Sequence, residues 1–194
     1  MIVVAGPPGS GKSTIFPVGE FGVDFFNIDD RAKDLNGGSY KGIPAALRRQ
    51  AQQACRDFIA SHIENGLSFA VETSLRDGSA IRDAQKAGIA GFETLLIYIA
   101  TNDPDVNIER IQLRARGSNG HSAPPDVIRK SYQDSLSYLS EAVKTFDYAL
   151  VHDNTQNALL NDARRPRLLL HFEHGTVTGT FPPLLPWVTR AGIP

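Results

Sequence analysis

The sequence is poor in cysteine, in long apolar runs and in any excess of charge. Cys55 is its single cysteine, so no disulfide can form within the chain, which fits a reducing compartment and excludes the usual cysteine-rich zinc site. No apolar run approaches the ~20 residues of a membrane helix. No basic segment precedes the apolar N-terminus, as it would in a signal peptide. We therefore expect a cytoplasmic protein that has no membrane partner.

Charge of one sign is not in excess. The chain has 20 Lys and Arg against 21 Asp and Glu, a formal net charge of −1. This balance excludes a chain-wide basic field, so no nucleic-acid partner is expected. With 194 residues, of which 41% are hydrophobic, the chain can fill one core. We expect a single domain that spans residues 1–194.

Short apolar runs alternate with helical patterns along most of the chain. Strands are expected at residues 1–5, 23–28, 67–71, 92–100 and 148–151. Helices are expected at 44–65, 77–86, 105–114 and 125–144. This alternation is typical of an α/β fold with a parallel sheet covered on both faces, here with a five-strand core. A β-hairpin is expected from 168 to 181, followed by an extended surface tail at 182–194.

One motif predicts nucleotide binding. Residues 6–13 read GPPGSGKS, which matches the phosphate-binding P-loop, G-x-x-x-x-G-K-[ST], between a predicted strand and a predicted helix. Its backbone N–H groups can turn inward onto phosphates. Lys12 can supply charge to the β- and γ-phosphates, and Ser13 a hydroxyl to Mg²⁺. The sequence therefore predicts a three-layer P-loop NTPase domain, with nucleotide contacts from Gly6, Pro7, Pro8, Gly9, Ser10, Gly11, Lys12, Ser13 and Thr14.

Several P-loop classes lack support in the sequence. A GTPase needs a guanine-reading Asn-Lys-x-Asp, which does not occur. Residues 35–39, LNGGS, look like an ABC signature but follow the P-loop too closely, so a flexible glycine-rich loop is favoured there. A motor ATPase would end a strand in Asp-Glu, which Glu72-Thr73 matches only loosely. A small kinase remains, with an ATPase or nucleotide-dependent switch that acts on a protein partner as the alternative. A nucleic-acid-end kinase is a weaker one.

A kinase needs an acceptor-activating carboxylate and cations over the transferred phosphoryl group. Asp29 follows the second predicted strand and can supply the carboxylate. The concentrated basic segment lies at 110–132, where small kinases carry a lid. It contains Arg110, Arg114, Arg116, His121, Arg129 and Lys130.

Structural interpretations of the same residues stay open. Asp29 could instead cap a following helix. Arg110 and Arg114 could lie on a solvated helix face, paired with Glu109 or Asp105, and Arg129 could pair with Asp126.

Taken in order, these motifs resemble the zeta-toxin-like kinases. The similarity covers the P-loop, Asn27-Ile28-Asp29, Glu72-Thr73-Ser74, residues 110–132 and His152-Asp153-Asn154-Thr155. It is strongest to the small chromosomal branch often described as predicted ABC-type ATPases.

The resemblance implies an ATP- and Mg²⁺-dependent kinase that acts on a small-molecule hydroxyl, in the classical members that of a UDP-N-acetyl amino sugar. It implies that Asp29 is the general base and that Glu72 places the acceptor or, with Ser13, the metal. Arg110, Arg114, Arg116 and Arg129 become phosphate contacts, Arg114 and Arg129 as catalytic residues. Asn154 joins the nucleotide site, and Thr73, Ser74 and His121 join the acceptor site. A toxin of this family would also have an antitoxin partner.

Overall fold

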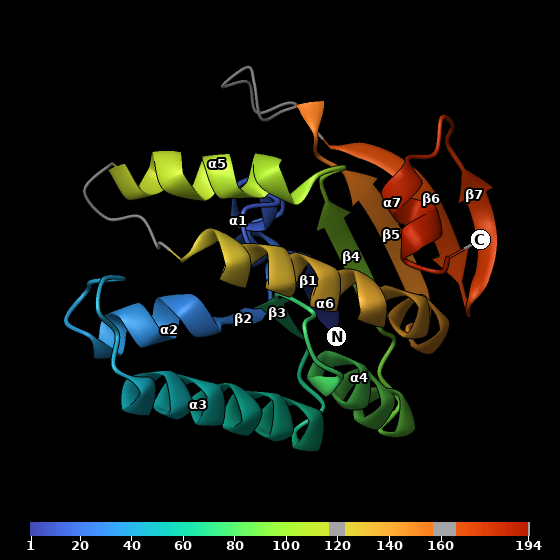
Figure 1. The fold of residues 1–194 in the computed structure, drawn as a ribbon. Coiled ribbons are helices and arrows are strands. Elements are labelled where there is room, and N and C mark those ends of the chain that lie inside the picture. Colours follow the sequence, from blue (N-terminus) through green and yellow to red (C-terminus); the bar gives the residue numbers. More distant parts are fainter. Residues whose placement is uncertain (117–122, 157–165, 194) are drawn as a thin grey trace.

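A sheet runs through the centre of the molecule. The structure, a computed structural model, describes residues 1–116, 123–156 and 166–193. Within this described part of the chain the sheet has seven strands in the order β2-β3-β1-β4-β5-β6-β7 (Figure 1). The first five in that order pair in parallel, which confirms the predicted parallel core. They are β1 (Ile2–Ala5), β2 (Asp24–Asn27), β3 (Phe69–Thr73), β4 (Leu95–Ala100) and β5 (Tyr148–Asp153).

The predicted hairpin also forms and extends the same sheet. β6 (Arg167–Glu173) pairs antiparallel with β5, and β7 (Thr176–Thr180) pairs antiparallel with β6. Leu169, Leu170 and Phe172 are buried from this added part of the sheet. The hairpin is therefore part of the main core.

Helices cover one face of the sheet. They are α3 (Ala45–Glu64), α4 (Ser79–Ile89), α6 (Pro125–Thr145) and α7 (Pro186–Arg190). Their buried side chains, such as Ile59, Ile81, Leu139 and Trp187, form one cluster with the strands. The opposite face carries the segment of α1 (Lys12–Ile15) and the 3₁₀ turn Val18–Glu20, where Val18 packs with Val4, Ile97 and Ile99. The helices on one face, the sheet and this segment on the other face make up the predicted three layers.

Two further helices lie near the carboxyl ends of the strands. They are α2 (Ile28–Leu35) and α5 (Pro104–Arg116) (Figure 1). The sequence analysis set no bounds for α2, although Ile28, Ala32 and Leu35 recur at the spacing of one helix face and pack together with Leu47 of α3. None of the helices in the described ranges is long and apolar enough to cross a membrane.

The expectation of an extended surface tail is wrong. Residues 186–190 form α7, and Trp187 is fully buried, with its ring 6.2 Å from that of Tyr98. Pro186 fits because proline is tolerated in the first turn of a helix. Pro186 therefore begins a helix that packs onto the sheet.

Replacing Trp187 with alanine should destabilise the fold. The lost burial and the cavity left behind should lower the free energy of unfolding by about 3–5 kcal/mol. Urea titration of Trp187→Ala against Leu184→Ala, a partly exposed neighbour in the same segment, measures this difference. Equal stability of the two variants would contradict the packing described here.

Candidate functional site

Three of the predicted motifs meet at the carboxyl edge of the parallel strands. The P-loop (residues 6–13) follows β1, and Asp29 follows β2. Glu72 is the second-to-last residue of β3 and is in register with Val4 of β1. This edge is where α/β sheets place ligands. A cavity of about 320 Å³ lies there, lined by Pro8, Gly9, Gly11, Lys12, Ser13, Thr14, Asn27, Asp29, Asp30, Tyr40, Glu72, Ile111 and Arg114.

The P-loop has a conformation that needs glycine. Gly6 and Gly11 have φ values of 140° and 99°, in the range that side chains rarely adopt. A Cβ atom on Gly6 would collide with the carbonyl oxygen of Ile99, and one on Gly11 with the side-chain amide of Asn154. The loop is therefore packed tightly against β4 and the end of β5.

Lys12 bridges the start of the loop. Its Nζ donates hydrogen bonds to the carbonyl oxygens of Gly6 at 2.8 Å and Pro7 at 3.1 Å. Burial lowers the pKa of Lys12, against the opposing charges of Glu72 and Asp29, which raise it. Lys12 is thus a desolvated cation held at the wall of the cavity.

Asn107 of α5 holds the middle of the loop, a contact that the sequence analysis did not predict. Its Nδ2 donates to the carbonyl oxygen of Pro8 at 2.7 Å, and its Oδ1 accepts a bond from the hydroxyl of Thr101. The Asn107 side chain is fully buried. Both of its polar ends are therefore committed to positioning the loop.

Arg110 and Asn154 hold the far end of the loop from behind. Arg110 donates to the carbonyl oxygens of Gly9 at 3.2 Å and Ser10 at 3.3 Å, and to that of Asn154 at 2.7 Å. The Asn154 side-chain amide also donates to the Ser10 carbonyl, at 2.7 Å. Neither residue lines the cavity. Their observed place differs from the expected contact with nucleotide: they position the P-loop backbone.

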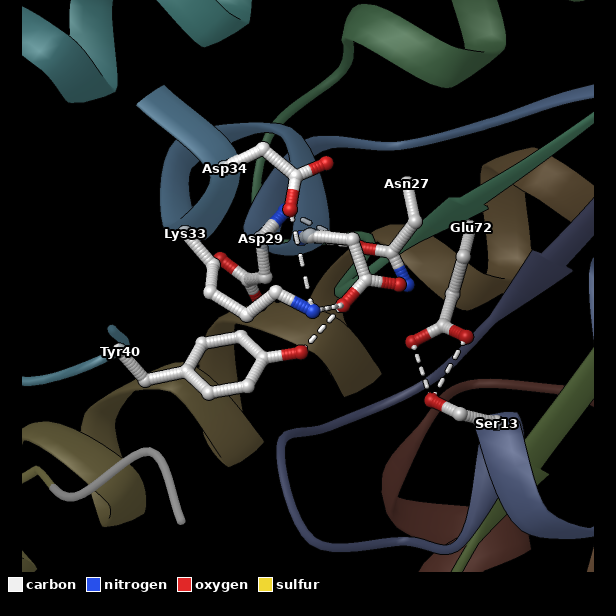
Figure 2. Close-up of polar contacts among 8 residues, drawn as sticks. Ser13, Asn27, Asp29, Lys33, Asp34, Tyr40 and Glu72 are labelled. Carbon is white, nitrogen blue, oxygen red and sulfur yellow. Dashed lines mark hydrogen bonds and ion pairs between the residues drawn. The ribbon is translucent and has the colours of Figure 1, made fainter. Parts of the chain in front are cut away.

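Ser13 and Glu72 converge at the side of the cavity that faces β3. The Ser13 hydroxyl lies 3.0 Å and 2.8 Å from the two carboxylate oxygens of Glu72 (Figure 2). Mg²⁺ takes oxygen ligands and is usually held by one or two protein groups together with phosphates and water. A hydroxyl and a carboxylate in contact fit such a site. Within the described ranges, no group of three or more His, Cys, Asp or Glu side chains could hold a metal ion by itself, so phosphates and water would have to complete the site.

Asp29 presents its carboxylate to the same cavity from the first turn of α2. Asn27 caps α2, because its Oδ1 accepts hydrogen bonds from the backbone N–H of Asp29 at 2.9 Å and of Asp30 at 3.3 Å. Asp29 is therefore not the helix cap, and its exposed side chain is left to line the cavity. The Asn two residues before Asp29, a residue type favoured at helix N-caps, is the sequence signal that could have identified this cap.

The lid residues are divided by the structure. Arg114 lines the same cavity as Lys12. Arg116 is exposed and does not line the cavity. Arg129 pairs with Asp105 at 2.6 Å, away from the lining residues and not with Asp126. His121 lies outside the described residues.

Two predicted acceptor residues near Glu72 also stay out of the cavity lining. The Thr73 hydroxyl accepts a hydrogen bond from the backbone N–H of Leu75 at 3.2 Å. Ser74 follows in the same turn and is not among the lining residues. Thr73 therefore shapes the turn after β3 in this structure.

The comparisons with known proteins support the fold. No family model matches the chain. An uncharacterised protein of Haemophilus influenzae is 29% identical over 132 residues, which are 68% of this chain and 91% of that protein. A solved chain of the PezAT chromosomal toxin–antitoxin system of Streptococcus pneumoniae superposes with a TM-score of 0.57 at 19% identity, over 79% of this chain and 68% of that one.

The AvrRxo1-ORF1:-ORF2 complex with ATP gives a TM-score of 0.67 at 12% identity. The match covers 91% of this chain but 59% of that one, so this chain spans less than two thirds of the AvrRxo1 chain. These likenesses confirm the P-loop fold. The resemblance to the zeta-toxin-like kinases thus holds at the level of the fold.

Acid should destabilise the protein through His152, which lies at the end of β5 with its ring against that of Phe16. Burial lowers the pKa of His152 from 6.5 to about 4, so the unfolded chain binds a proton more readily than the folded one. Stability from this group is complete above pH 6.5 and is lost as the pH falls toward 4. Between pH 7 and 4.5 the loss should be about 2–3 kcal/mol.

Urea unfolding of the wild type, His152→Gln and His171→Gln at both pH values tests this expectation. His152→Gln should have a shallower pH dependence, whereas His171→Gln, a substitution of a partly exposed histidine on β6, should keep the wild-type dependence. Equal pH dependence in all three would contradict the assignment.

Removing the Asn107 side chain should loosen the P-loop. Asn107→Ala leaves the Pro8 carbonyl and the Thr101 hydroxyl without these partners, at a cost of about 1–3 kcal/mol. Where binding ATP must then order the loosened loop, about 1.4 kcal/mol of this free energy is lost from binding, and ATP should bind about tenfold more weakly. Calorimetric titration with ATP measures this, with Gln112→Ala on the exposed side of α5 as control. Unchanged ATP affinity in Asn107→Ala would show that the loop does not depend on this bond.

Proposed function

We propose that the protein is an ATP-dependent kinase that transfers the γ-phosphoryl group of MgATP to a hydroxyl of a small acceptor. One observation carries the proposal: the exposed carboxylate of Asp29 lines the same cavity as Lys12 and the Ser13–Glu72 pair. A hydrolase that only positions water would not need a second, separate carboxylate at the end of β2. The shared fold with the AvrRxo1 complex that was solved with ATP adds support.

The residues of the cavity divide the reaction between them. The P-loop N–H groups and Lys12 would bind the phosphates, and Ser13 and Glu72 would hold Mg²⁺, which would supply positive charge to those phosphates. Asp29 orients the acceptor hydroxyl and accepts its proton as the oxygen bonds to the γ-phosphorus. The bond from that phosphorus to the bridging oxygen breaks, and ADP leaves. Arg114 neutralises charge on the transferred group.

A protein partner is a further part of the proposal. The two compared structures come from a toxin–antitoxin system and from a two-component complex. We infer that this chain, too, has an antitoxin-like protein partner. A UDP-N-acetyl amino sugar is the acceptor that the family resemblance suggests.

The proposal can be tested by mass spectrometry of an acceptor pool incubated with MgATP and the purified protein. The pool should contain sugars, amino sugars, UDP-sugars, nucleosides and dinucleotides. Wild type should add one phosphoryl group to one compound. Asp29→Asn should lower the rate of transfer by about 10²–10⁴-fold, the loss expected when a general base is removed, while ATP still binds. Lys12→Ala should weaken both transfer and ATP binding.

Asp34→Asn is the matched control, because Asp34 is an exposed carboxylate on the same helix that does not line the cavity. It should retain transfer. Full turnover in Asp29→Asn would remove Asp29 as the base. ADP release without any phosphorylated compound would favour an ATPase or nucleotide-dependent switch.

A further inference from the structure

The glycine-rich segment after α2 is an ordered loop that carries Tyr40. The Asn36 side-chain amide donates to the carbonyl oxygens of Ser39 at 2.8 Å and of Lys41 at 3.0 Å, one on each side of Tyr40. The Ser39 hydroxyl oxygen accepts a bond from the Lys41 N–H at 3.1 Å. Gly37 and Gly38 have positive φ values, which lets the chain turn back at this point. These hydrogen bonds therefore hold the backbone on both sides of Tyr40.

Tyr40 is fixed against the first turns of α2, at the edge of the cavity. Its hydroxyl donates a hydrogen bond to the Asp30 carboxylate, and Lys33 Nζ lies 5.2 Å from its ring centroid (Figure 2). Burial, followed by the bond to Asp30, raises the pKa of Tyr40, so the hydroxyl stays protonated. Tyr40 lines the cavity together with Asn27, Asp29 and Asp30.

Carboxylates outnumber cations in the cavity lining. The lining cations are Lys12 of the P-loop, which also interacts with Glu72 and Asp29, and Arg114 of α5, and the phosphates of ATP would meet them. The part of the lining from the end of β2 to Tyr40 consists of Asn27, Asp29, Asp30 and Tyr40, which bring two carboxylates and, among the described residues, no cation.

Lys33 offsets this excess only in part. Its Nζ lies 4.0 Å from the lining carboxylate of Asp30 and 3.9 Å from Asp34, which is outside the lining, so one charge is shared between two carboxylates. Proteins recognise phosphate groups through Arg and Lys, and an excess of carboxylates repels them.

We propose that the loop of residues 36–41 and the first turn of α2 form the acceptor subsite, and that this subsite takes an uncharged or cationic hydroxylated compound. The inference rests on the proposed kinase function and deepens it. It departs from the sugar nucleotide of the family resemblance, whose diphosphate would have to enter a subsite with two carboxylates and no lining cation among the described residues. The aromatic ring and hydroxyl of Tyr40 suit a small polyol, sugar or amino sugar.

The test uses a metabolite extract separated on an anion exchanger into an unretained fraction, neutral and cationic, and a retained anionic fraction. Each fraction is incubated with the full chain and the same saturating concentration of labelled MgATP. We expect transfer to the unretained fraction to exceed that to the retained one by about tenfold or more. A defined pair, N-acetylglucosamine against UDP-N-acetylglucosamine, repeats the comparison with the sugar held constant.

The outcomes separate this inference from the function on which it rests. Greater transfer to the retained fraction, or to the UDP-sugar of the pair, would overturn the acceptor class and leave the kinase standing. No transfer in either fraction by a protein that still binds ATP would overturn the kinase function and the subsite together.

Two conservative variants locate the effect. For the compound phosphorylated in the unretained fraction, Asp30→Asn and Tyr40→Phe should raise the acceptor KM, by about tenfold for a lost charged contact, and leave the KM for ATP unchanged. Asp34→Asn, on the same helix, should behave as wild type. Equal acceptor KM values in all of these proteins would remove the subsite from this loop.

Discussion

The architecture of the site depends on how the P-loop carbonyl groups are held. A loop that turns its N–H groups toward a phosphate must turn carbonyl oxygens away from it, and buried carbonyls need donors. Here every carbonyl from Gly6 to Ser10 accepts a side-chain hydrogen bond. The donors are Lys12, Asn107, Arg110 and Asn154. The concave side is therefore preorganised before any nucleotide binds, which reduces the ordering that binding must impose.

These donors explain why the sheet order matters to the site. Asn107, Arg110 and Asn154 are about a hundred or more residues away from the loop along the chain, and they reach it because β4 lies beside β1 and β5 lies beside β4. On the other side, β3 brings Glu72 to Ser13. The β4 and β5 side thus supports the loop from behind, and the β3 and β2 side supplies the reactive groups in front of it.

The sequence could predict what repeats with a period or forms a contiguous motif. Each strand of the parallel core and the P-loop belong to this class, and so does Asp29, which follows a strand. Asn107 could not be found, because an asparagine within a helical pattern carries no sign that its partner is Pro8. The same holds for Arg110, where the basic residue was visible but its contact with backbone carbonyls was not. Trp187 was misjudged because proline-rich composition outweighed a large apolar side chain.

The charged side chains of the site interact with one another. Lys12, desolvated by burial, is compensated by Glu72 and Asp29, whose charges oppose the lowering of its pKa. Bound phosphates would become new partners of Lys12, and a divalent cation would become a new partner of Glu72. The interaction of Lys12 with Asp29 would then be shared with the phosphates. Nucleotide binding would thereby leave the exposed carboxylate of Asp29 open to an acceptor hydroxyl in the same cavity.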